Sequence, residues 1–134
     1  MLHPQLAKDC IPVGDLSVCR ILLMNNSHFP WLVLVPMREN LREIFDLTEN
    51  DYHTVMSEVR HTARQFNELT NADKMNVATL GNLVPQLHIH VIARYRHDSA
   101  WPSPVWNSPV SPEPYSADLL SLLSEKIRKS LALA

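Results

Sequence analysis

Two histidines placed two positions apart, His88 and His90, are the residues of this chain whose type and spacing best suit chemistry. Neutral imidazole is available near neutral pH as a nucleophile, a proton carrier or a metal ligand, because its unperturbed pKa is about 6.5. In an extended strand every second side chain points to the same face, at intervals of about 6–7 Å. Both imidazoles would therefore project side by side, with the amide of Gln86 next to them.

The surrounding segment, Gln86–Arg94, has the alternation of a strand. Its second face is apolar and suits a core; it carries Leu87, Ile89, Val91 and Ala93. A half-buried strand without any function shows the same alternation, so the pattern alone leaves a purely structural interpretation open. A metal site is another alternative, in which His88 and His90 share an ion with a carboxylate or with His97.

The composition is that of one soluble globular domain. The chain has 134 residues, of which 46% are hydrophobic and 19% charged, enough for one substantial core. The formal net charge of −2 gives no basic surface for nucleic acid, although a local site for a small anion stays open. We expect one domain over residues 1–134, with its main part at about 10–107 and a C-terminal segment and helix at 98–134.

Several function classes are excluded by what the chain lacks. Its only glycines are Gly14 and Gly81, so neither a Walker loop nor a dinucleotide-binding glycine fingerprint is present. The N-terminus has no signal-peptide pattern, and the apolar runs are far shorter than the ~20 residues of a membrane-spanning helix. Cys10 and Cys19 stand alone and suit packing in a reducing compartment. We therefore expect a cytoplasmic protein without membrane or nucleic-acid contacts.

The hydrophobic pattern predicts an α+β fold, with an antiparallel sheet of about five strands, one long helix and a C-terminal helix. The first two strands are expected to form a hairpin, because turn-forming residues separate them. Pro12–Asp15 is expected to be a turn. The strands are predicted at 17–24, 31–35, 74–80 and 86–94.

Helix signals occur at three places. Pro4 suits the first position of a short helix that ends near Asp9. Thr48 begins a capping box, and apolar residues recur every three or four positions over 49–69, which predicts one long amphipathic helix. Ser116 suits the cap of a final helix. Between the last strand and that helix, residues 98–115 contain five prolines and two tryptophans, and rings of that size favour packing over a disordered tail.

This order of segments resembles the histidine triad (HIT) superfamily, whose motif reads His-φ-His-φ-His-φ-φ, with φ an apolar residue. Gln86-Leu-His88-Ile-His90-Val-Ile fits the motif with glutamine in the first place. Leu23–Pro36 resembles the family's first hairpin, and Lys74–Gln86 resembles the strand and turn before the motif. Ala100–Trp106 is similar to a segment of bacterial members described as diadenosine-tetraphosphate-hydrolase-like. The likeness covers about residues 10–107.

The resemblance implies a nucleotide-phosphate hydrolase or nucleotidyl transferase, acting at an α-phosphate through a covalent histidine intermediate. His88 holds the middle place and would be the nucleophile, with a nearby backbone carbonyl keeping its other nitrogen protonated. His90 would contact the phosphate or protonate the leaving oxygen, and Gln86 would complete the catalytic group. Dinucleoside polyphosphates and nucleoside phosphoramidates are the implied substrates.

The same resemblance assigns a substrate-binding role to four further residues. Asn25 falls where the family holds the ribose hydroxyls, and Asn76 and Asn82 fall near positions that contact phosphate or surround the nucleophile. Carboxamides suit such ligands because they carry both donors and an acceptor. Trp106 would line the nucleotide site. A structural role in a turn, a strand or a packed core is the alternative for each.

Two departures from the family pattern limit this interpretation. Gln86 replaces the first motif histidine and cannot titrate, and Trp31 stands where some members carry another histidine. Both leave open an alternative class, a nucleotide-binding protein with little or no catalytic activity. The resemblance also implies a homodimer and no cofactor of the protein's own. Whether Mg²⁺ arrives with the substrate phosphates stays open.

Overall fold

A five-stranded antiparallel sheet, in the order β1-β2-β3-β5-β4, forms the centre of the protein. The computed structural model describes residues 1–134. The predicted α+β class, the 17–36 hairpin, the long helix and the C-terminal helix are all confirmed. In chain order the elements are α1 Pro4–Asp9, β1 Cys10–Asp15, β2 Cys19–Met24, β3 Trp31–Pro36, η1 Ile44–Asp46, α2 Glu49–Thr70, β4 Lys74–Ala78, β5 Ile89–Arg94, η2 Val105–Asn107 and α3 Ala117–Leu131.

The structure corrects two of the expected boundaries. Pro12–Asp15, expected as a turn, belongs to the edge strand β1, which adds to the four predicted strand ranges and completes the five-stranded sheet. Proline is tolerated there because β1 is an edge strand, and the register with β2 shifts between Pro12 and Gly14. The motif strand also begins later than expected, at Ile89, so Gln86 and His88 lie in the turn that leads into β5.

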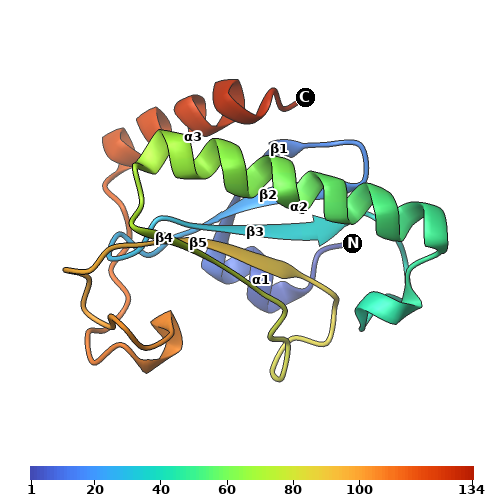
Figure 1. Ribbon diagram of the computed structural model, residues 1–134, viewed down its shortest axis with the longest axis horizontal. Coiled ribbons are helices and arrows are strands. Elements are labelled where there is room, and N and C mark those ends of the chain that lie inside the picture. The colour runs from blue at the N-terminus through green and yellow to red at the C-terminus, as the bar shows by residue number, and fades with distance from the viewer.

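Each face of the sheet is covered by its own core. Figure 1 shows α2 and α3 side by side on one side of the sheet and α1 on the other. The helix side packs α2, with Phe66, and α3 against inward residues of the strands, including Ile21, Leu34 and Val91. The second side packs α1 and residues 98–115, here called the Pro/Trp segment, against Val33 and other buried residues. No helix is long and apolar enough to cross a membrane.

Because both faces of the sheet are covered, the polar side chains of the motif strand are not exposed to solvent. His88 and His90 are each only 4% exposed, and Arg94 is 1% exposed. The alternative of a half-buried strand whose polar side simply faces solvent therefore does not hold. Covered imidazoles need specific partners, because a buried polar group without a hydrogen bond is costly.

The Pro/Trp segment is fastened to the sheet by a buried ion pair. Arg94 donates to both carboxylate oxygens of Asp98, at 2.8 and 3.0 Å, and to the carbonyl oxygen of Ser103 at 2.8 Å. The guanidinium carbon also lies 5.8 Å from the ring centroids of Phe29 and Trp101. These contacts hold the segment that carries η2, whose Trp106 lies against the ring of His90.

Glu58 on α2 ties the long helix to the start of β2. Its carboxylate accepts the backbone N–H groups of Val18 and Cys19 at 2.8–3.2 Å. We expect Glu58→Met to destabilise the fold by about 2–4 kcal/mol, since it leaves two buried donors unpaired. Glu58→Gln keeps an acceptor oxygen and should cost clearly less. Urea unfolding of the two variants measures the difference, and equal losses would contradict the assignment.

Candidate functional site

His88 is held so that one imidazole nitrogen is left free. Its Nδ1 lies 2.7 Å from the carbonyl oxygen of Gln86, two residues earlier. A carbonyl oxygen only accepts, so Nδ1 carries the proton and donates it. For the neutral ring, Nε2 then keeps an unshared electron pair. The turn before β5 thus prepares His88 as a nucleophile or base without an acidic partner.

His90 has the opposite proton placement. The indole Nε1–H of Trp31 donates to His90 Nδ1 at 3.0 Å, and indole can only donate. The proton of neutral His90 must therefore be on Nε2, which lies 3.5 Å from the carbonyl oxygen of Leu80. The two imidazole centroids are 4.9 Å apart. The pair accordingly offers a lone pair from His88 beside an N–H from His90.

Burial, with a smaller contribution from neighbouring His88, lowers the pKa of His90 to about 4. Between that value and the unfolded value near 6.5, the unfolded chain binds more protons, so stability must rise with pH in this window. We expect wild type to gain up to about 3 kcal/mol from pH 4 to 6.5 relative to His90→Gln, which does not titrate. Chemical unfolding of both proteins at a series of pH values measures this gain. If the free energies of unfolding of the two proteins changed in parallel with pH, the prediction would be contradicted.

The two histidines lie at one wall of a cavity of about 710 Å³. The cavity runs between the N-terminal segment with α1, the end of β2, and the 80–84 turn. Apolar and aromatic groups supply much of its lining, as expected for a site that takes a flat ring. Its lining includes His3, Leu6, Met24, Asn25, Trp31, Asn82, Leu83, Val84, His88, His90 and Trp106.

Three of the predicted substrate-binding residues line this cavity. Asn25 follows β2, and its Oδ1 accepts the backbone N–H of Tyr115 at 2.9 Å, which orients its amide. Asn82 lies in the turn before the motif and also borders a second cavity of about 470 Å³ that reaches His88. Trp106 is 41% exposed and stands edge-on to His90, with ring centroids 4.9 Å apart.

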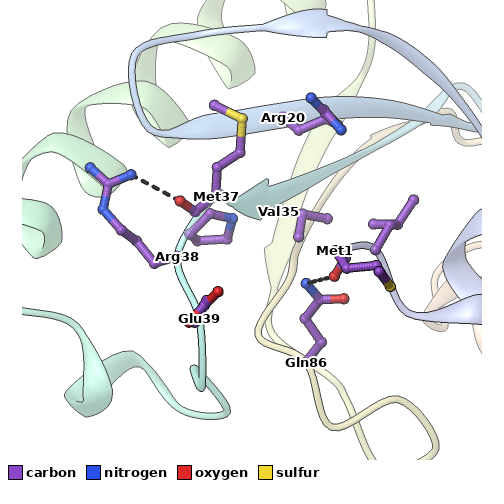
Figure 2. Close-up of a pocket in the computed structure, with 9 residues that line it drawn as sticks. Met1, Arg20, Val35, Met37, Arg38, Glu39 and Gln86 are labelled. Atoms are coloured by element: carbon purple, nitrogen blue, oxygen red, sulfur yellow. Dashed lines mark hydrogen bonds between the residues drawn. The ribbon is translucent and has the colours of Figure 1, made fainter.

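Gln86 does not turn its side chain toward the histidines. Its Oε1 accepts the backbone N–H of His3 at 2.7 Å, and its Nε2 donates to the carbonyl oxygen of Met1 at 3.1 Å. Figure 2 shows the amide pointing at Met1, beside a cavity of about 480 Å³ that also contains Arg20 and Arg38 and no histidine. Only the backbone carbonyl of Gln86 contacts an imidazole. The side chain instead holds the N-terminal segment that walls the histidine cavity.

Asn76 is the predicted site residue that the structure does not bring to the histidines. It lies on β4, pairs in register with Ile92, and accepts from Arg94 Nη1 at 2.9 Å. It therefore belongs to the buried ion-pair network and lines neither cavity at His88.

The alternative of a metal site has no third ligand, since no group of three histidine, cysteine or acidic residues could hold an ion. His97 instead stacks on Tyr95.

Sequence patterns did not reveal several of the cavity's contributors. The N-terminal segment has no motif that marks it as a wall of the site. Gly81 is a second case: a Cβ there would lie 2.6 Å from the carbonyl oxygen of Val84 and 3.3 Å from His88 Cε1. Only glycine lets this turn pack so closely on the imidazole. The sequence offered one signal for this role: Gly81 is one of only two glycines and lies five residues before the motif.

The fold and the paired imidazoles define a histidine triad protein, and the comparisons agree. The model of the HIT domain matches residues 5–97, so the chain belongs to this family. A comparison with proteins of curated function gives no significant match.

Solved structures of histidine triad proteins resemble the chain over nearly its whole length. One from Marinobacter aquaeolei is 41% identical, with a TM-score of 0.95, and the alignment covers 100% of this chain and 98% of the other. One from Bradyrhizobium japonicum is 40% identical, with a TM-score of 0.94 and 98% and 97% coverage. One from Sinorhizobium meliloti is 38% identical, with a TM-score of 0.93 and 97% and 96% coverage. This family membership supports a function of the nucleotide-binding or hydrolase type.

Proposed function

We propose that this protein is a nucleotide-phosphate hydrolase or nucleotidyl transferase of the diadenosine-tetraphosphate-hydrolase-like kind, with His88 as its nucleophile. The observation that carries the proposal is the hydrogen bond from His88 Nδ1 to the carbonyl oxygen of Gln86, at 2.7 Å. It leaves Nε2 as a lone pair at the wall of a cavity large enough for a nucleotide.

The reaction would proceed in two displacements. His88 Nε2 attacks the α-phosphorus, an N–P bond forms, and the bond from phosphorus to the leaving group breaks, with its electron pair departing on that group. The Nδ1–H keeps donating to the carbonyl oxygen of Gln86, and this hydrogen bond stabilises the positive charge that the ring acquires. Water or another acceptor then attacks phosphorus, the N–P bond breaks, and the acceptor's proton is released.

The roles of the neighbouring residues follow from their positions. His90 Nε2–H would exchange its long contact with the carbonyl oxygen of Leu80, 3.5 Å, for a phosphate oxygen, where charge increases in the transition state. Asn25 would hold the ribose hydroxyls, and Asn82 a phosphate oxygen, through the polar groups that they present to the cavity. Trp106 would pack on the base. Asn76 would act only indirectly, by supporting Arg94. The proposal requires no protein-bound metal, and Mg²⁺ would enter with the substrate phosphates.

Calorimetry with AMP and turnover assays with diadenosine tetraphosphate test the proposal together. We expect AMP to bind and the dinucleotide to be cleaved to AMP and ATP. Asn25→Ala should weaken AMP binding by about 5- to 20-fold, the loss of one or two hydrogen bonds. Tight AMP binding without turnover of any α-phosphoryl substrate would favour the alternative class, a nucleotide-binding protein without catalysis. No binding at all would exclude both.

The homodimer implied by the resemblance stays a prediction. β4 forms one edge of the sheet, pairs only with β5, and exposes half of Val77, so it leaves unpaired backbone groups that a second copy could use. Sedimentation at micromolar concentration decides it. We expect a dimer, and a monomer across the concentration range would exclude it.

A further inference from the structure

Trp31 donates its indole N–H to the His90 nitrogen that would have to gain a proton in the imidazolium. The indole N–H points at His90 Nδ1 from 3.0 Å, and both side chains are buried. An imidazolium carries a proton on each nitrogen. Protonating His90 would therefore place two N–H groups against each other at this contact, unless Trp31 moved. Trp31 lies on β3, with its backbone in register with Ile92 on β5, so the fold keeps the indole in place.

The surroundings of His90 offer its cation little compensation, only a long contact of 3.5 Å from Nε2 to the carbonyl oxygen of Leu80. His88 lies beside it, and Trp106 meets it edge-on, with centroids 4.9 Å away. The other ionisable groups that line the cavity are His3, Lys8 and Asp9, all on the N-terminal side, and none is hydrogen-bonded to His90. Burial and His88 lower the pKa of His90 to about 4. His90 thus stays neutral near physiological pH and can donate a hydrogen bond but not a proton.

We infer that Trp31 is a positioning residue that keeps His90 neutral, and that the site is thereby selective for phosphoric anhydrides over phosphoramidates. The inference rests on the proposed function, which leaves both substrate classes open. A phosphate or polyphosphate leaving group departs as a stable anion when its bond to the α-phosphorus breaks. An amine must receive a proton as the P–N bond breaks, and the single N–H of neutral His90 is too weak an acid to supply it. A general acid is typically worth about 10²–10⁴-fold in rate.

The activity test compares two substrates that share the adenosine 5′-phosphoryl group. We expect wild type to cleave diadenosine tetraphosphate with a kcat/KM at least about 100-fold above that for adenosine 5′-phosphoramidate. Trp31→Phe keeps an aromatic ring but removes the N–H. Trp31→Phe should reduce the ratio of the two kcat/KM values by about 10-fold or more near pH 6. The phosphoramidate reaction of this variant should also become faster as the pH falls and His90 gains a proton. A purely structural role for Trp31 would lower both activities and leave their ratio and pH profiles alone.

The proton placement is tested without catalysis, by ¹⁵N-detected NMR of the histidine rings. In wild type, His90 should carry its proton on Nε2 and remain neutral down to about pH 5. Trp31→Phe should raise the pKa of His90 because the opposing N–H is gone, while burial and His88 still hold that pKa below the free value near 6.5. Trp106→Phe is the matched control, because Trp106 touches the same ring without a hydrogen bond and should leave the tautomer unchanged. If Trp31→Phe does not fold, the wild-type titration and Trp31→His replace it.

The outcomes separate this inference from the proposed function. Efficient phosphoramidate cleavage by wild type, or His90 protonated at pH 6, would overturn the inference while leaving the nucleophile assignment intact. Absence of any covalent nucleotidyl adduct and any turnover would overturn the proposed function, and the substrate preference with it.

Discussion

His88→Asn is expected to lower turnover of diadenosine tetraphosphate by on the order of 10⁴-fold or more, because removing a catalytic nucleophile abolishes the covalent route. Asparagine approximates the size of the ring near the backbone but offers no nucleophilic nitrogen. His88 is buried, so part of the change reports on packing as well. Steady-state kinetics, with AMP affinity measured on the same preparation, separate the two: binding should change far less than turnover.

The matched control is His53→Asn, at a histidine on the exposed side of α2, whose side chain is 69% exposed. This variant should retain wild-type kinetics. If His88→Asn kept more than about a tenth of the wild-type rate, water rather than His88 would be the attacking group in the reaction.

Asp98→Asn is expected to lower the free energy of unfolding by about 3–5 kcal/mol, because it leaves the charge of Arg94 buried without a counter-ion. The pair is nearly inaccessible, with 2% and 4% side-chain exposure. This loss corresponds to a fall of roughly 10–20 °C in the midpoint of thermal unfolding. Because Arg94 also holds Ser103 and Asn76, the variant should loosen the segment that carries Trp106, and AMP binding should weaken as well.

An exposed pair of the same chemistry serves as the comparison. Arg20 and Asp15 make an equally short contact, 2.8 Å, but their side chains are 45% and 34% exposed. Asp15→Asn should cost less than about 1 kcal/mol. Similar losses in the two variants would show that burial does not determine the strength of the Arg94–Asp98 pair.

The pH dependence of the Asp98 effect has a definite sign. Burial alone would raise the pKa of Asp98, but hydrogen bonds from Arg94 and from three backbone N–H groups lower it to about 2. The stabilisation is therefore complete above the unfolded value near 3.9 and is lost as the pH falls toward 2. The difference between wild type and Asp98→Asn should shrink below about pH 3.

Elements with a strong local signal could be predicted from the sequence. The helix after Thr48 has a capping residue and an apolar period, and the structure begins it at Glu49 with Thr48 accepting from Asp51 N. The strand that contains Pro12 could not be found in this way, because proline and glycine locally favour a turn. Its pairing with β2 along the edge of the sheet, a tertiary effect, overrides that preference.

At the site, the sequence predicted that His88 and His90 come together, but not that Asn76 lies elsewhere, nor how the site residues are bonded. The alternation of His88 and His90 places both rings on one face, and the structure agrees. The direction of Gln86 toward Met1 depends on an N-terminal segment more than eighty positions away, which no local pattern encodes. The donation from Trp31 to His90 likewise depends on strand register. The proton placement that gives the two histidines different roles therefore requires the structure.

The central claim, that His88 becomes covalently bound to a nucleotide, is tested most directly by trapping. Wild-type protein mixed with diadenosine tetraphosphate and quenched in alkali, where N–P bonds of phosphohistidine survive, should gain the mass of one adenylyl group. Peptide mapping should place that group on His88, and His88→Asn should gain none. Turnover by wild type with no adduct at any quench time, or an adduct that persists in His88→Asn, would contradict the account.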